Sequence, residues 1–286
     1  MPTGATLSNH LMDQGEATFP GDYRTPAARV STKARVLIAL FVLLLLSAVY
    51  LWFFGPQTVA AIGARYYITR KAPVVSMAPA QLTDLSISRS PGKKLSYFGY
   101  EFEVPWSDMD NSKSKMIGDN KELIAFQSGN TLSVWHGSPR AFVNSVLSND
   151  KIDPSTIRRI YGDEALSSDS AFYRTLLETT PEKITPFMPR QDAVGRAFLL
   201  IVKGIILPRG TQSGIFAVTA GEFSGFQFGR PQNQSGEVSV RLFSATGSLN
   251  FIFVHPAGGP TVISQPDINR ILQTLHKSAS PPIAKP

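Results

Sequence analysis

The chain contains no cysteine among its 286 residues. Disulfide bonds, thiolate metal ligands and a thiol nucleophile are therefore all excluded. Any folded domain must be held together by its hydrophobic core alone, and 43% of the residues are hydrophobic, which is ample for a core.

Clusters of like charge are also lacking. The net charge is +7, but residues 1–35 carry four basic and three acidic groups, and the rest of the excess is spread without any run of one sign. Nucleic-acid binding usually needs a basic stripe or a known module. Neither is present, so we predict no nucleic-acid partner. Arg65, Arg70 and Lys71 could attract anionic lipid headgroups, although a role as topology determinants explains them more simply.

Motifs for catalysis or cofactor binding are missing as well. The histidines are His10, His136, His255 and His276. They show no metal-ligand spacing, and neither a His-Glu-x-x-His nor a phosphate-binding Gly-Lys-Ser/Thr motif occurs. There is no Gly-x-Ser-x-Gly elbow, and residues 210–214 fit a turn. The sequence therefore predicts no catalytic residue, no cofactor and no metal site.

One segment imitates the start of a calcium loop. Asp108 and Asp110 stand at its first and third positions, which must offer oxygens. However, Lys113 occupies the position that needs glycine, and Asp119 the position that needs glutamate. A solvated turn is the better interpretation.

Isolated glycines and tryptophans have structural explanations. Gly225, Gly229 and Gly236 fit strand ends and turns better than a nucleotide-binding loop. Trp106 and Trp135 fit core or edge aromatics better than a binding platform.

What the sequence does contain is one long apolar run. It begins at Val36, ends at Phe54 and holds neither charge nor proline over its 19 residues. As a helix it covers about 28 Å, close to the hydrocarbon thickness of a bilayer. Tyr50 and Trp52 lie near one end, where amphipathic rings favour the interface. The glycine-proline pair at 55–56 is expected to stop the helix.

A cleaved secretory signal is the competing interpretation of this run. Its apolar region would be shorter, about 7–15 residues, and followed closely by small residues. The nearest such site, around Ala61 and Gly63, lies well beyond the end of the run. We therefore predict an uncleaved single-pass transmembrane helix of the signal-anchor type.

The flanking cations predict the orientation of this helix. Arg24, Arg29, Lys33 and Arg35 crowd its N-terminal side more closely than any cations crowd the other side. The N-terminus is then cytoplasmic and the main domain extracytoplasmic, in a protein of the plasma (inner) membrane.

Composition divides the rest of the chain. Residues 1–35 are polar and rich in small side chains, which predicts a disordered cytoplasmic tail. Residues 55–92 are predicted to be a juxtamembrane tether, and residues 93–277 one extracytoplasmic domain. Residues 278–286 contain three prolines and are predicted to be a disordered tail.

Hydrophobic periodicity in the main domain predicts an α+β fold. Alternation at 98–104 predicts a half-buried strand, and two runs around the turn at 128–130 predict a hairpin. Further strands are predicted at 215–219, 223–228, 238–242 and 249–254, the last of them central because it is apolar on both faces. Helices are predicted at about 142–147, 169–179, 191–207 and 268–275. The whole is an antiparallel sheet of about six strands covered by helices.

The stretch at 191–207 is the most apolar part of this domain. Arg196 and Lys203 interrupt it, so it is predicted to be a buried helix and not a second membrane span.

Both ends of the domain resemble a known family. The residues from Gly99 to Trp106, GYEFEVPW, resemble the first strand of Mog1/PsbP-like domains. The C-terminal part of these domains is resembled by three successive features: a hairpin of long strands, a loop, and a helix ending in ILQTL at 271–275. The middle of the domain departs from that pattern. The chain also resembles uncharacterised single-span bacterial proteins with an exported domain. The resemblance implies a non-enzymatic role in binding or in assembly of membrane complexes, and carries no catalytic residues.

Two functional hypotheses follow, from different classes. The first is a membrane-tethered extracytoplasmic interaction or assembly module, anchored in the lipid bilayer from Val36 to Phe54, with a protein partner in the envelope. The alternative is an extracytoplasmic hydrolase or small-ligand-binding domain with a site that matches no motif. This alternative requires four side chains to converge in one pocket: His136, His255, Glu101 and Glu103. A sensor signalling across the membrane is disfavoured, because the short N-terminal tail contains no recognisable signalling domain.

Overall fold

The structure is a computed structural model that describes residues 32–149, 153–231, 236–256, 259 and 261–278. The chain divides into two compact units, Met1–Val49 and Tyr50–Pro286, and each is described by itself. The tails predicted at residues 1–35 and 278–286 lie almost entirely outside the described residues.

The helix α1 (Thr32–Lys71) contains both the apolar run and the residues after it. Its part Thr32–Phe53 is long and apolar enough to cross a membrane, by length and composition. The expected stop at 55–56 interrupts the helix without ending it. Gly55 leaves the helical region with φ 73° and ψ 165°, and the chain then resumes as helix as far as Lys71. Pro56 is tolerated because a first helical turn needs no N–H from it.

The first part of the segment predicted as a tether, residues 55–71, is therefore helical and belongs to the second unit. Thr58 and Ala61 are buried. Ala61 packs in one cluster with Ala193 and Leu200 of α5 (Arg190–Ile206). The small side chain of Ala61 allows the two helices to approach closely.

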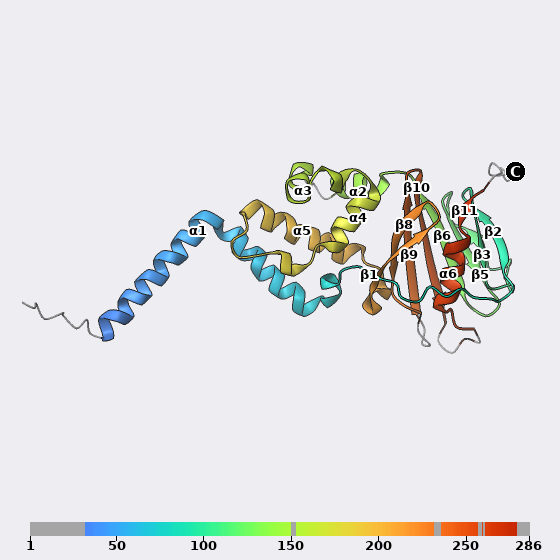
Figure 1. The fold of residues 1–286 in the computed structure, drawn as a ribbon, viewed down its shortest axis with the longest axis horizontal. Coiled ribbons are helices and arrows are strands. Elements are labelled where there is room, and N and C mark those ends of the chain that lie inside the picture. The colour runs from blue at the N-terminus through green and yellow to red at the C-terminus, as the bar shows by residue number, and fades with distance from the viewer. Residues whose placement is uncertain (1–31, 150–152, 232–235, 257–258, 260, 279–286) are drawn as a thin grey trace, which may run out of the picture. The chain divides into compact units, whose positions relative to one another are not determined.

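The second unit is built on an eight-stranded sheet. Its strands are β1 (Ala80–Gln81), β4 (Lys115–Met116), β5 (Lys121–Ala125), β6 (Thr131–Gly137), β7 (Ile215–Ala220), β8 (Phe223–Phe228), β9 (Gly236–Ser244) and β10 (Gly247–His255). They lie in the order β1-β7-β8-β9-β10-β6-β5-β4 (Figure 1). β10 is interior to the sheet, as its apolar sequence predicts.

The α+β class is confirmed, but the predicted antiparallel sheet of about six strands is wrong in detail. β1 pairs with β7 in parallel, whereas the other paired strands of this sheet are antiparallel. β1 and β4 have two residues each, too few to leave a periodic pattern in the sequence.

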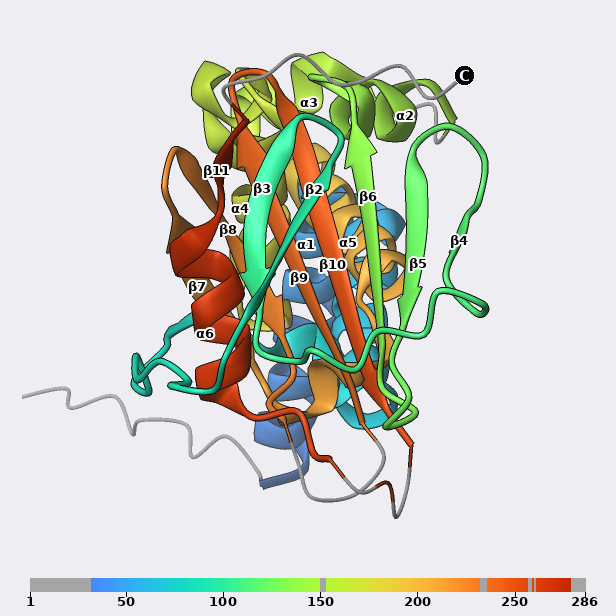
Figure 2. The ribbon, with the colours of Figure 1, turned by 90° about the vertical axis from the view of Figure 1, so that its right-hand side faces the viewer.

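A second, three-stranded sheet and one helix cover one face of the large sheet (Figure 2). They are β2 (Lys93–Tyr97), β3 (Tyr100–Val104), β11 (His276–Lys277) and α6 (Gln265–Thr274). The strand predicted from residue 98 begins at Tyr100, because Phe98 and Gly99 form the turn of the β2–β3 hairpin with φ values of 56° and 80°.

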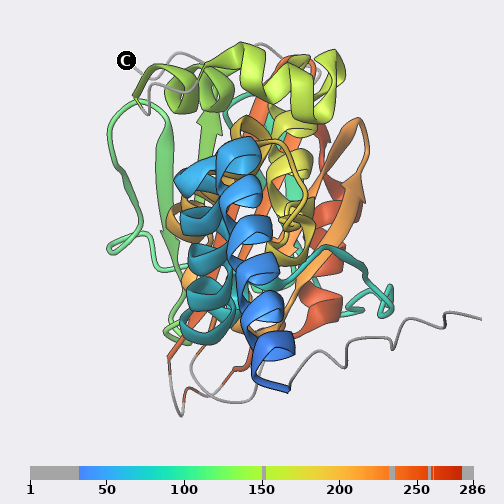
Figure 3. The ribbon, with the colours of Figure 1, turned by 90° about the vertical axis from the view of Figure 1, so that its left-hand side faces the viewer.

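Helices cover the opposite face of the large sheet (Figure 3). They are α2 (Ala141–Asn149), α3 (Pro154–Tyr161), α4 (Asp169–Glu178) and α5, joined by the short 3₁₀ turns η2 (Asp163–Leu166) and η3 (Pro181–Lys183). Two further 3₁₀ turns, η1 (Pro73–Ser76) and η4 (Arg209–Ser213), precede β1 and β7. The helix α3 was not predicted, although Asp153 before Pro154 is a helix-start signal; its carboxylate accepts from the Ser155 N–H at 2.9 Å.

Candidate functional site

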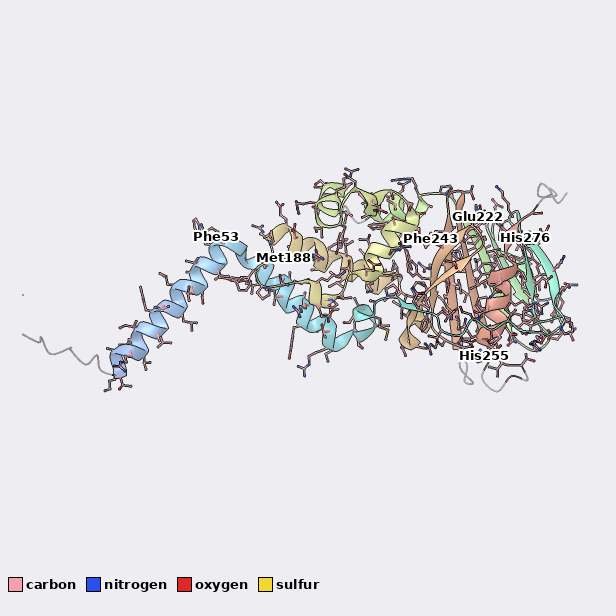
Figure 4. All side chains as sticks on the ribbon, viewed as in Figure 1. Phe53, Met188, Glu222, Phe243, His255 and His276 are labelled. Atoms are coloured by element: carbon pink, nitrogen blue, oxygen red, sulfur yellow. The ribbon has the colours of Figure 1, made fainter. Side chains whose placement is uncertain are left out.

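The histidines singled out from the sequence lie apart. His136 on β6 pairs with Leu249 of β10, whereas His255 stands six positions further along β10. At about 3.4 Å per residue the two are roughly 20 Å apart. Figure 4 shows His255 of β10 well apart from His276, which lies on β11 of the three-stranded sheet. His10 lies outside the described residues.

The two glutamates of β3 each lie beside a basic side chain. Glu103 Oε2 lies 3.0 Å from Arg270 Nη2 of α6, and Glu101 Oε2 lies 3.5 Å from His276 Nε2. The Ser278 hydroxyl donates directly to the carboxylate, at 2.8 Å from Glu101 Oε1. A serine nucleophile is activated instead by donating to an imidazole that a carboxylate orients. The pocket that the hydrolase alternative requires is therefore not assembled from these four residues.

The segment that imitates a calcium loop is an Asx turn. Asp110 accepts from the Ser112 backbone N–H at 3.0 Å and lies 3.2 Å from the Lys113 ammonium. Hydrogen bonds from Ser112, and then Lys113, hold the pKa of Asp110 below its usual value. Asp108 accepts from the Ser128 N–H at 2.8 Å. Within the described residues no group of three or more His, Asp or Glu is placed to hold a metal ion.

The two tryptophans differ in environment. Trp106 is buried in the core with its ring centroid 5.1 Å from that of Phe126, as the sequence predicted. Trp135 is half-buried, lines a groove of about 320 Å³ beside Ile205 of α5, and carries the Lys121 ammonium 5.1 Å from its ring centroid.

Two cations, for which the sequence indicated no structural role, hold the helical layer to the rest of the unit. Lys203 of α5 is fully buried, and its ammonium donates to the carbonyls of Met77, Leu177 and Thr179 at 2.7, 2.6 and 3.0 Å. Leu177 lies in the last turn of α4, and Thr179 follows it. Lys203 thus satisfies carbonyls that a helix end leaves without partners.

Arg241 of β9 has the same role at the end of α5. Its guanidinium donates to the carbonyl of Ile206, the last residue of α5, at 3.2 Å, and to the hydroxyl of Tyr173 at 2.8 Å. Burial raises the pKa of Tyr173 to about 12, with Arg241 opposing the rise. Arg241 alternates with apolar residues along β9, and the helical layer covers the face from which its side chain projects.

A cleft of about 600 Å³ lies at the edge of the large sheet. β1 pairs only with Phe216 and Ala217 of the six-residue strand β7. Val218 and Thr219 therefore line the cleft, and no other strand of the described chain pairs with β7 on that side. An uncovered strand edge offers backbone N–H and C=O groups to another extended segment.

Helices flank this cleft from both faces of the sheet. Arg174 and Glu178 project from α4, while Asn269 and Gln273 project from α6. The outer wall is residues 82–85, which follow β1. The cleft thus combines an open strand edge with charged groups of both signs and apolar surface.

Asn269 fixes the outer wall of the cleft. Its amide donates to the carbonyls of Asp84 and Ser86 at 2.9 and 2.8 Å. Replacing Asn269 by alanine should speed deuterium exchange at residues 84–88 by about tenfold or more, because two hydrogen bonds of about 1 kcal/mol each are lost. Exchange measured by mass spectrometry checks this, with Gln273→Ala on the same helix as the control. Equal exchange in both variants would contradict the assigned role of Asn269.

A groove of about 990 Å³ lies beside the last residue of the apolar span, Phe53. Thr156 of α3 and Phe198 of α5 also line it. Arg159 and Asp192 join the two helices there, with 2.9 Å between Arg159 Nε and Asp192 Oδ1.

No family model, no curated protein and no solved structure matches this chain. The resemblance to Mog1/PsbP-like domains therefore stays a prediction.

Proposed function

We propose that the chain is a single-pass membrane protein whose second unit is an extracytoplasmic module for binding a protein partner. The anchor would be the apolar part of α1, Thr32–Phe53. Its N-terminal end would be cytoplasmic, because cations crowd that side. The membrane would be the plasma (inner) membrane.

The packing of α1 favours an anchor over a cleaved signal. A signal peptidase would have to cut near Ala61 or Gly63, within a helix that packs on α5. Thr58 and Ala61 are buried, and both precede such a cut. Cleavage there would remove residues that belong to the folded unit.

The observation that carries the binding role is the cleft at the uncovered part of β7. A partner in extended conformation could continue the sheet beside Val218 and Thr219, where the main-chain groups give affinity. Arg174 and Glu178 lie within reach of its side chains and would select their charges. The partner we propose is therefore an extended segment of another envelope protein.

Single cysteines test the topology without background, because the native chain has none. Met116 is exposed on β4, so Met116→Cys should react with a membrane-impermeant maleimide in intact cells. Ser8→Cys should react only after permeabilisation. The reverse pattern would place the domain in the cytoplasm. If the mass of the mature chain shows that it begins near Ala64, the protein is released by cleavage and is not anchored.

The same approach tests the binding cleft. Thr219→Cys, carrying a photoactivatable crosslinker in native membranes, should give a discrete adduct with a heterologous protein. Met116→Cys, at the opposite edge of the sheet, should not. Equal adducts from both positions, or none from Thr219→Cys, would refute the cleft as the binding site. An adduct of twice the chain mass would replace the partner by a second copy of this chain.

A further inference from the structure

Large aromatic side chains are exposed near the N-terminal end of the second unit. Trp52 and Phe53 end the span and are 86% and 75% exposed. Phe187, in the loop between η3 and α5, is 79% exposed. Figure 4 labels Phe53 on α1 and Met188, the neighbour of Phe187, in this loop.

The loop is tied to α1 within the second unit. The Tyr50 hydroxyl donates to the Pro186 carbonyl at 2.7 Å, and the Arg65 guanidinium donates to the Ile184 carbonyl at 2.6 Å. Pro186 and Pro189 restrict the backbone on either side of Phe187. Phe187 therefore follows directly after a residue that is bonded to the last turn of the span.

The side chains around Phe53 and Phe187 have the chemistry expected of a surface that contacts lipid. Tyr50, Trp52 and Phe53 belong to the span, so a bilayer that holds the span has its interface at their level. Aromatic side chains concentrate at that level. A cation follows the loop: the Arg190 side chain lies over Gly55, with Cδ 3.4 Å from the position a Cβ would take there. Such a cation favours anionic headgroups.

We propose that the loop at 184–189 inserts Phe187 into the membrane interface beside Trp52 and Phe53. The second unit then contacts the bilayer at two points, the span and this loop, and is held in one orientation above it. This inference rests on the proposed anchor. The occupant of the exposed aromatic surface is lipid, because the proposed anchor ends in this surface and brings it to the bilayer.

A fluorescent probe at Phe187 tests this inference. Phe187→Cys, labelled with the environment-sensitive fluorophore NBD, is reconstituted as the full chain in phosphatidylcholine–phosphatidylglycerol vesicles. Its emission should shift to shorter wavelength than that of labelled Met116→Cys. Lipids spin-labelled near the headgroup should quench it several-fold more strongly than they quench the probe at 116, and aqueous iodide several-fold less.

Two further measurements separate the possible failures. Thr185→Cys keeps Phe187 in place and should show the same protection from iodide. Flotation of the vesicles reports the anchor by itself. If the protein floats and probes at 185 and 187 are as accessible to iodide as the probe at 116, the loop inference is wrong and the anchor stands. If the protein does not float, the anchor proposal fails and the loop inference falls with it.

Discussion

Replacing Lys203 by methionine should lower the free energy of unfolding by about 2–4 kcal/mol. The substitution leaves the carbonyls of Met77, Leu177 and Thr179 without the ammonium donor that binds all three. A buried acceptor without a partner costs about 1–3 kcal/mol. The sum is offset in part, because methionine avoids the desolvation of a buried charge.

The pH dependence of stability gives a second signature of this lysine. Burial lowers the pKa of Lys203 from 10.5 to about 8, with Lys183 acting in the same direction and Glu182 opposing it. Between those values the unfolded chain binds more protons than the folded one, so the stability contributed by this group rises with pH. The full difference corresponds to on the order of 3 kcal/mol. The wild-type curve should therefore rise relative to the Lys203→Met curve from about pH 8 upward.

Chemical denaturation in nonionic detergent, followed by tryptophan fluorescence, measures both effects. Lys94→Met is the matched control: it removes the same side chain from an exposed position on β2 and should change stability by less than about 0.5 kcal/mol. Parallel pH curves for wild type and Lys203→Met between pH 8 and 10 would show that Lys203 is not the titrating group. That window ends below the raised pKa values of Tyr97 and Tyr161.

Replacing Gly225 by alanine should destabilise the domain by about 3 kcal/mol or more. Gly225 lies within β8, opposite Leu242 of β9. An added Cβ would stand 1.9 Å from the Arg241 carbonyl oxygen and 2.8 Å from the Leu242 Cα. Both atoms are backbone, so the two strands would have to separate and weaken their hydrogen bonds.

Thermal unfolding of the two glycine variants checks this prediction. Gly63→Ala is the control: Gly63 lies in α1 with nothing within 4 Å of the added Cβ. Alanine there should be neutral or stabilising by up to about 1 kcal/mol, because it restricts the unfolded chain and favours helix. Similar melting temperatures for both variants would contradict the close approach of β8 and β9 at Gly225.

Several elements could be predicted because their signals are local. The turn at 128–130 brings Ala125 and Thr131 into the register expected of a hairpin, and the stretch at 191–207 is the helix α5. Gly225 was placed at a strand end or turn, but it lies inside β8. Glycine is required there because the backbone of the neighbouring strand β9 approaches closely. Periodicity along β8 alone does not reveal that approach.

The cleft could not be predicted for a related reason. Its walls come from four separated segments: residues 79–85, 174–178, 217–226 and 269–273. None of them carries a motif, since the feature that matters is an uncovered backbone edge. That edge exists only because β1 ends after pairing with Phe216 and Ala217.

The sequence by itself determined the apolar span, the absence of thiol chemistry and the α+β class. These three features depend on composition and on periodicity within short stretches of sequence. They can therefore be read without knowing which residues contact one another in the folded protein. Only the tertiary structure decided what the cations of the domain do. Lys203 interrupts an apolar run in the sequence, and Arg241 alternates with the apolar residues of β9. Each side chain instead donates to carbonyls near the end of a helix. The helical layer packs over the sheet and so brings helix ends that are distant in the sequence within hydrogen-bond distance of these cations.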